Sequence, residues 1–325
     1  MYEAFRSHCV QDYPEYEIIF GVSEPDDPAV DLVKQLQQEF PQTRIGWVVC
    51  PKKLGANVKV SNLQQMLASA RYECLLVNDS DIRVPPDYLS RVMAPLADER
   101  VGLVTCLYRG VAASTLGSWL ESLGISTDFI PGVLVASLLE EGLHFALGST
   151  MAFRRADLAR IGGFESIVDF LADDYELGRR IAGLGLRIEL SDTVVETHLP
   201  AYDMRGFLAH QLRWARGVRD ARPGGYLGLV TTFGLVWGIL VVALAQGAPW
   251  SWAVLGTTVL LRLLVAMTVG GFLLRDRAAW RDLWLLPARD LIAVAVWIAS
   301  FFGHSVTWRG DRFELKDGRL IRAGE

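Results

Sequence analysis

Pairs of acidic residues recur at three points in the first part of this chain. They belong to the segments "SEPDDPAV", "VNDSDIRV" and "FLADDYELG", which contribute Asp26 and Asp27, Asp79 and Asp81, and Asp173 and Asp174. Aspartate is common in turns and at helix starts for purely local reasons, so one such pair is weak support for a site. Three pairs in one half-chain instead indicate a shared cleft in which carboxylates hold a cation and accept a proton.

Asp79 and Asp81 form a D-x-D motif directly after the apolar run "ECLLV". Two carboxylates on one tight loop can hold a hard divalent cation, Mg²⁺ or Mn²⁺, which neutralises a diphosphate. The alternative is an ordinary turn rich in Asp and Ser. The position between a predicted buried strand and "RVPPDYL" favours the metal site.

Asp173 and Asp174 precede a helix predicted over "YELGRRIAGLG". Acids near a helix N-terminus are stabilised by the helix dipole, so the pair could simply cap this helix. Capping explains one acid better than two, because adjacent carboxylates raise each other's pKa and partial burial raises it further. We therefore predict that Asp174 is a general base.

Basic and aromatic residues form a second group in "FLAHQLRWARGVR", where helical spacing places His210, Arg213, Trp214 and Gly217 on one face. An arginine there can clamp a leaving diphosphate, and a tryptophan can form the wall of an acceptor or sugar pocket. The alternative, which is compatible, is a basic amphipathic helix lying on anionic lipid. The loop "CPKKLGANVKVSN", which includes Lys59, suits contacts to a nucleotide but could equally be a solvated loop.

Short β-rich runs alternate with helical stretches up to about residue 200, with strands predicted at 16–22, 44–50, 73–79 and 101–107. This alternation is typical of an α/β fold with a mostly parallel sheet and crossover helices. Ligands of such sheets bind at the carboxyl ends of the strands, which is where the first two acidic pairs fall.

The composition changes after residue 225, and this change accounts for a chain that is 51% hydrophobic yet 21% charged. Residues 226–246 and 250–274 are predicted to span a membrane, the second interrupted by Arg262. Basic residues flank both runs and are absent from "QGAPWSW" between them. The positive-inside rule therefore predicts a hairpin with the α/β domain in the cytoplasm. We expect 284–304 to be interfacial or re-entrant.

The expected organisation is a transferase-like α/β domain at 1–203, an interfacial helix at 204–225, and a membrane region at 226–325 with a basic cytoplasmic tail. A formal net charge of −5 without a long basic run gives no support for nucleic-acid binding. Histidine spacing gives no support for a zinc hydrolase.

Read in order, "DDP", "DSDIRV", "ADDYELG" and "HQLRW" resemble processive-type inverting glycosyltransferases of the GT-A (Rossmann-like) fold. More narrowly, they resemble the ceramide glucosyltransferase family, glycosyltransferase family 21, over nearly the whole chain, to "VTWRGDRFEL". The resemblance implies a UDP-sugar donor, a divalent cation, a lipid acceptor, and an integral membrane protein of a bacterial inner membrane with a cytoplasmic catalytic domain.

By position, the resemblance places donor binding at Asp27, Lys59 and Asp79, and the metal at Asp79 with Asp81. It makes Asp174 the catalytic base. Acceptor and diphosphate binding fall on the family's [RQ]-x-x-R-W motif, here His210, Gln211, Arg213 and Trp214.

Two departures from the family pattern stand out. The motif opens with His210, and the usual Gln lies one place later, at Gln211. The family also has an N-terminal span and a first strand before the region that begins here, and a missing strand would leave the uridine pocket open on one side.

The expected function is inverting transfer of a hexose, glucose by resemblance, from a UDP-sugar to a lipid hydroxyl. Ceramide is the favoured acceptor, and a hopanoid polyol that accepts a glycosyl or N-acetylglucosaminyl group is the competitor. A polysaccharide synthase would need several more spans. An inactive membrane scaffold is the non-enzymatic alternative.

Overall fold

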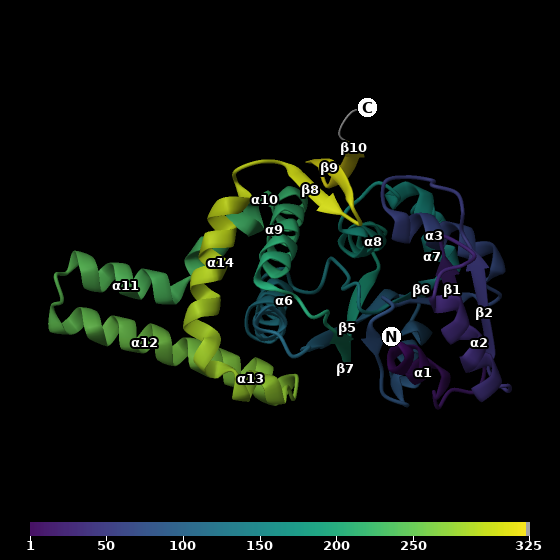
Figure 1. Cartoon of the computed structure of the whole chain (residues 1–325), viewed down its shortest axis with the longest axis horizontal. Helices are drawn as coiled ribbons and strands as arrows, with labels where there is room; N and C mark the ends of the chain where they lie inside the picture. Colours follow the sequence, from purple (N-terminus) through teal and green to yellow (C-terminus); the bar gives the residue numbers. More distant parts are fainter. Residues whose placement is uncertain (323–325) are drawn as a thin grey trace.

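The computed structural model describes residues 1–322 and shows an α/β body joined to long apolar helices (Figure 1). The predicted end of the membrane region at residue 325 lies outside the described residues. The body contains α1 (Tyr2–Cys9), β1 (Glu17–Val22), α2 (Ala29–Glu39), β2 (Arg44–Val49), α3 (Val58–Met66), β3 (Cys74–Val77), β4 (Ile82–Arg83), α4 (Tyr88–Met93), β5 (Val101–Val111), β6 (Met151–Arg154), α7 (Arg155–Arg160), α8 (Asp173–Ala182) and β7 (Arg187–His198).

The main sheet has five strands in the order β3-β6-β5-β7-β4. Its long central pair, β5 and β7, is parallel, whereas β3–β6, β5–β6 and β4–β7 are antiparallel. The strands β1 and β2 form a separate parallel sheet. The α/β fold is confirmed, but the expectation of a mostly parallel sheet was wrong. The alternation of strands and helices does not determine the direction of each strand. The helical stretch Leu116–Leu139 connects β5 to β6, and after it β6 enters the sheet antiparallel to both of its neighbours, β3 and β5.

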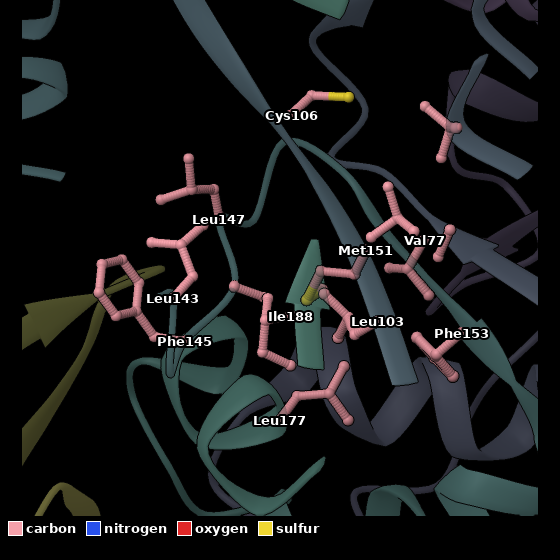
Figure 2. Packing of buried hydrophobic residues seen from close by; sticks show 14 of the residues in the cluster. Val77, Leu103, Cys106, Leu143, Phe145, Leu147, Met151, Phe153, Leu177 and Ile188 are labelled. Atoms are coloured by element: carbon pink, nitrogen blue, oxygen red, sulfur yellow. The ribbon is translucent and has the colours of Figure 1, made fainter. Parts of the chain in front are cut away.

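The hydrophobic core lies around β5, which is buried on both faces as its unbroken apolar run predicts. Leu103 of β5, Met151 and Phe153 of β6, and Ile188 of β7 point into one packed cluster (Figure 2). Leu177 of α8 packs against the same cluster, which fixes the first turn of α8 relative to the sheet. The core thereby positions Asp173 and Asp174.

The remaining helical segments, most of them apolar, lie beside the sheet or project beyond it (Figure 1). They are α5 (Leu116–Gly124), the π-helical segment η3 (Ile125–Phe129), α6 (Ile130–Leu139), α9 (Met204–Ala221), α10 (Pro223–Gly228), η5 (Leu229–Thr232), α11 (Gly234–Leu244), α12 (Pro249–Val265), the π-helical segment η6 (Ala266–Leu273), α13 (Arg277–Arg281), η7 (Leu283–Leu285) and α14 (Leu286–Ser300). The helices α11 and α12 form the hairpin that projects furthest in Figure 1.

Three helices are long and apolar enough to cross a membrane, namely Leu116–Leu139, Pro249–Leu273 and Leu283–Ser300. A fourth candidate is the pair Pro223–Thr232 and Gly234–Leu244, which is bent by 53° at Phe233. The run at 226–246 is therefore not one straight helix. Trp237 Nε1 donates to the carbonyl of Val230 at 2.7 Å across the bend, and this hydrogen bond stabilises the break between the two helices.

Two features of these helices differ from what their composition suggested. The helix ending at Ser300 begins at Leu283 and so is longer than the apolar stretch within 284–304, because its charged residues Arg289 and Asp290 contact partners inside the protein. The helix Leu116–Leu139 was not predicted, because Glu121 and Asp128 interrupt its apolar pattern. In both helices the charged side chains contact residues of other helices, so the helix continues through them.

A small antiparallel sheet of β8 (Ser305–Trp308), β9 (Asp311–Lys316) and β10 (Arg319–Arg322) ends the described chain. It packs on the segment before α8, where Leu171 N donates to Gly318 O at 3.1 Å. Arg216 and Arg219 of α9 donate to backbone carbonyls between residues 300 and 305. These two basic residues are therefore engaged within the protein.

Candidate active site

The centre of the candidate site is an ion cluster built from three separate elements. Lys59 lies in the first turn of α3, Asp79 follows β3, and Asp173 is the first residue of α8. Lys59 Nζ lies 2.7 Å from Asp79 Oδ1 and 3.1 Å from Asp173 Oδ2. These carboxylates raise the pKa of Lys59 despite its burial, so it stays charged. The expectation that Lys59 belongs to a loop was wrong, because Asn57 caps a helix that begins at Val58.

Asp174 has a different environment from its neighbour Asp173. Its Oδ2 accepts a hydrogen bond from Gly148 N at 2.8 Å, and its Oδ1 accepts one from Tyr175 N at 2.7 Å. Burial and the charge of Asp173 raise the pKa of Asp174 to about 6, although Lys59 lowers it. Asp173 instead contacts Lys59 and is held by Asn57. Asp174 is thus the carboxylate of the pair suited to accept a proton near neutral pH.

Gly148 brings the two acidic motifs together. A Cβ at this position would lie 3.1 Å from Asp174 Oδ2 and 3.3 Å from Asp79 Oδ2. The two carboxylates therefore approach the same backbone position although they lie far apart in sequence. The absence of a side chain at Gly148 leaves the space that both of them use.

Asp81, the second acid of the D-x-D motif, is linked to the end of β7. Its Oδ2 accepts from Thr197 Oγ1 at 3.1 Å, and burial together with the charge of Asp79 raises its pKa. Within residues 1–322 no group of three or more His, Cys, Asp or Glu side chains is arranged to hold a metal. The two carboxylates suit a cation that keeps waters and takes its remaining ligands from a substrate diphosphate.

Asp27 lines the same cavity as this cluster. Its Oδ1 accepts from Ala29 N at 2.8 Å, so it shapes the turn that starts α2. Asp27, Asp79 and Asp174 all line one continuous cavity. The structure thus gathers the three acidic segments around one space.

The helix α9 supplies the basic and aromatic side of the cavity. Arg213 Nη2 lies 3.1 Å from His210 Nδ1, which must accept because guanidinium nitrogens only donate. Burial and the charge of Arg213 lower the pKa of His210 to about 4, so the ring is neutral. Trp214 packs against Phe129 with ring centroids 5.5 Å apart, and Phe129 packs against Tyr108 at 5.6 Å. These rings form a continuous aromatic row.

Gln211 points to a different part of the cavity from Arg213. Its Nε2 donates to Glu121 Oε2 at 2.7 Å, and its Oε1 accepts from Arg289 Nη2 at 3.0 Å. His210 Nε2 lies 3.6 Å from the other oxygen of Glu121. The two residues that open the motif therefore share one buried carboxylate, and Gln211 links α9 to α14.

The cavity has a volume of about 2340 Å³ and runs from the acids to the apolar helices. Its far part is lined by apolar side chains of α6, α10, α11 and α14, among them Leu139, Tyr226, Phe233 and Trp297. The cavity thus joins a charged end, suited to a phosphorylated ligand, to an apolar end, suited to hydrocarbon.

Several residues of the site were missed from sequence. Asn57, Gly148, Glu121 and Arg289 each contact a predicted site residue. The sequence Gly-Ser-Thr before β6 was a weak indication for Gly148, because glycine is often found where another group approaches the backbone closely. The charges of Glu121 and Arg289 within apolar stretches were the signal for the other two, because ionisable residues there are generally functional.

Comparison with known proteins gives a consistent result. The model of the family described as "Glycosyl transferase family 21" matches residues 1–321. Ceramide glucosyltransferase 3 of Caenorhabditis elegans is 23% identical over an alignment of 335 positions that covers 99% of this chain and 71% of that protein. Beta-monoglucosyldiacylglycerol synthase of Synechocystis is 23% identical over an alignment of 218 positions that covers 64% of this chain and 43% of that protein. The crystal structure of S. aureus TarS covers 98% of this chain at 15% identity and a TM-score of 0.40, and the match spans 57% of that chain.

Proposed function

This chain belongs to glycosyl transferase family 21 and is a glycosyltransferase, and we propose that it transfers glucose from UDP-glucose to a hydroxyl of ceramide with inversion. The observation that supports this most is the position of Asp174. This carboxylate, with a pKa of about 6, lines a cavity that continues to apolar helices. A base of this kind between a charged and an apolar end fits a lipid hydroxyl as the group that is activated.

The donor would bind at the charged end of the cavity. Asp27 lies where a nucleotide could reach it, and Lys59 and Arg213 provide positive charge for the diphosphate. Because guanidinium and ammonium groups pair strongly with phosphate oxygens, they would orient the bond that breaks.

In the chemical step, the proton of the lipid hydroxyl moves to Asp174. The hydroxyl oxygen forms a bond to the anomeric carbon from the face opposite the diphosphate, and the bond to UDP breaks with its electron pair on the phosphate oxygen. An α-linked donor thereby gives a β-linked product. Arg213 and Lys59 offset the charge that grows on the leaving group, which is electrostatic stabilisation of the transition state.

A divalent cation would be held by Asp79 and Asp81. When bound, it would supply charge neutralisation of the diphosphate. Lys59 bridges Asp79 to Asp173, so this chain's own residues hold the loop in place.

The acceptor would reach the cavity from the membrane. The candidate spans at Pro249–Leu273 and Leu283–Ser300 and the bent pair before them border the apolar end. We propose that the α/β body within residues 1–203 is the cytoplasmic catalytic domain, that α9 lies at the interface, and that the apolar helices between residues 226 and 300 are anchored in a bacterial inner membrane. A lipid could then present its hydroxyl to Asp174 while its chains remain among the apolar helices.

The test is a transfer assay with the full chain in membranes, UDP-glucose, and either ceramide or a hopanoid polyol. Ceramide should be glucosylated, and NMR of the product should show a β-glycosidic bond. If only the hopanoid were glycosylated, the proposed acceptor would be wrong but the proposed reaction would stand. Retention of the α-linkage, or transfer to no lipid, would contradict the proposal.

A further inference from the structure

Arg289 on α14 is a buried arginine with unused hydrogen-bond donors. Its side chain is 8% exposed, and in residues 1–322 its Nε and Nη1 atoms have no hydrogen-bond partner. Its third nitrogen, Nη2, donates to Gln211 Oε1. Buried polar donors without acceptors are costly, so the free Nε and Nη1 donors of Arg289 indicate a ligand that completes them.

Asp128 offers an unused acceptor beside these donors. Its Oδ1 accepts from Arg262 Nη2 at 2.6 Å, while its Oδ2 lies 3.6 Å from Arg289 Nη2. Over the described part of the chain, Oδ2 has no hydrogen-bond partner. Asp128 and Arg289 both line the cavity that contains Asp174. An acceptor and several donors are thus available side by side.

The backbone of α5 packs closely against the guanidinium of Arg289. A Cβ at Gly124 of α5 would lie 2.5 Å from both Nε and Nη2 of Arg289, so only glycine allows this position of the guanidinium. Asp128 belongs to the π-helical segment η3, and such segments are frequent at functional sites. The next residue, Phe129, belongs to the aromatic row that reaches Trp214.

The charge of the surrounding cluster limits what could bind. Arg262 contacts Asp128 and Asp290, and Arg289 lies 3.6 Å from Asp128, so two arginines face two aspartates. The charges of these four residues balance, so the cluster has no net positive charge to attract an anion. A phosphate group would bring further negative charge next to Asp128, whereas a neutral polar group would not.

We propose that Arg289 and Asp128 bind a neutral amide or hydroxyl group of the lipid acceptor, distinct from the hydroxyl that receives the sugar. Arg289 donates to an oxygen of the acceptor at this point, and Asp128 accepts an N–H or O–H hydrogen beside it. The pair thereby selects lipids with an amide or a second hydroxyl over lipids with a phosphate headgroup. This inference rests on the proposed function, because it concerns the acceptor of the same reaction.

The experiment compares acceptors for the full chain in phosphatidylcholine nanodiscs with UDP-glucose. The acceptors are ceramide, N-methylceramide, which lacks the amide hydrogen, and phosphatidylglycerol, which has hydroxyls but an anionic phosphate. Wild type should glucosylate ceramide, show a higher KM for N-methylceramide, and leave phosphatidylglycerol largely unmodified. This comparison needs no variant.

The variant Arg289→Met should raise the KM for ceramide by about ten- to a hundredfold, because a hydrogen bond to a charged group is lost. Arg289→Lys, which keeps the charge but loses the fork, should lie between. Binding of UDP-glucose should be unchanged in both, which shows that the proteins fold. The same substitution at the exposed Arg277 of α13, Arg277→Met, is the matched control and should have no effect on either KM.

The outcomes separate this inference from the proposed function. Equal KM values for ceramide and N-methylceramide, or equal use of phosphatidylglycerol, would overturn the inference while lipid glucosylation stands. An unchanged ceramide KM in a folded Arg289→Met protein would do the same. If wild type hydrolysed UDP-glucose but transferred sugar to no lipid, both the proposed function and this inference would fail.

Discussion

The ammonium group of Lys59 lies 2.7 Å from Asp79 Oδ1, which joins the start of α3 to the loop after β3. Because Lys59 also contacts Asp173, it connects both acidic motifs of the site through one charge. The same charge lowers the pKa of Asp174, against the larger effects of burial and Asp173. Lys59 therefore links the two acidic motifs and also lowers the pKa of the predicted base.

Removal of this charge should change the pH dependence of transfer. In Lys59→Met the pKa of Asp174 should rise, so the acid limb of the activity profile should move to higher pH by about one unit. Lys59→Arg, which keeps the charge, should leave the limb near its wild-type position. The measurement is kcat/KM for sugar transfer between pH 5 and 8. Coincident profiles for Lys59→Met and wild type would show that Lys59 does not act on the base.

Wild-type activity should itself fall in acid. A base with a pKa of about 6 is protonated below that pH, so kcat/KM should decrease about tenfold per unit below it. His210 is not expected to cause this limb, because burial and Arg213 lower its pKa to about 4. The inflection should therefore persist in His210→Gln. Loss of the inflection in that variant would assign it to the imidazole instead.

The position of Asp174 could be anticipated from sequence, but its surroundings could not. Two adjacent acids before a helix predicted an unusual carboxylate, although α8 begins at Asp173, two residues earlier than predicted, so both acids lie in its first turn. Which of the two faces the cavity depends on Gly148 and Lys59, which reach α8 through the tertiary packing of the sheet. Such contacts leave no local sequence pattern, because the residues around each partner are those that its own helix or turn requires.

Gly148 should be intolerant of a side chain for a reason specific to this site. A methyl group in Gly148→Ala would lie 3.1 Å from Asp174 Oδ2 and 3.3 Å from Asp79 Oδ2, so both carboxylates would have to shift. Small displacements of reacting groups are costly, and transfer should fall by tenfold or more, up to about a hundredfold. The melting temperature should change little. Gly142→Ala, at a glycine with nothing within 4 Å of the added Cβ but a φ of +140°, would reveal a backbone effect alone.

Dependence on a divalent cation should follow the D-x-D motif. Chelation of divalent cations should abolish transfer. Asp81→Asn should raise the Mn²⁺ concentration needed for half-maximal activity by more than about tenfold, because losing only a hydrogen bond to a metal ligand already lowers metal affinity about tenfold. Thr197→Val removes such a hydrogen bond, the one Asp81 accepts at 3.1 Å, and should have a smaller effect in the same direction. Full activity in chelator would exclude the metal site.

The sheet and the apolar helices show where sequence patterns were insufficient. Apolar periodicity predicted strands such as β5 correctly, but strand direction depends on how the chain returns, and β6 returns antiparallel. In the same way, Glu121 and Asp128 concealed the helix Leu116–Leu139. Their charges read as interruptions because Arg262 and Gln211, their partners, lie on other helices.

The most direct test of the account is the single-turnover rate of Asp174→Asn with UDP-glucose and ceramide. An amide in this position keeps the shape of the side chain but cannot accept the proton, so the rate should fall by about a hundredfold or more while UDP-glucose still binds. Asp27→Asn, altered in the turn before α2 that lines the same cavity, should mainly affect donor KM. A rate for Asp174→Asn above a few percent of wild type, roughly what loss of a base allows, would contradict the role of Asp174 as the base.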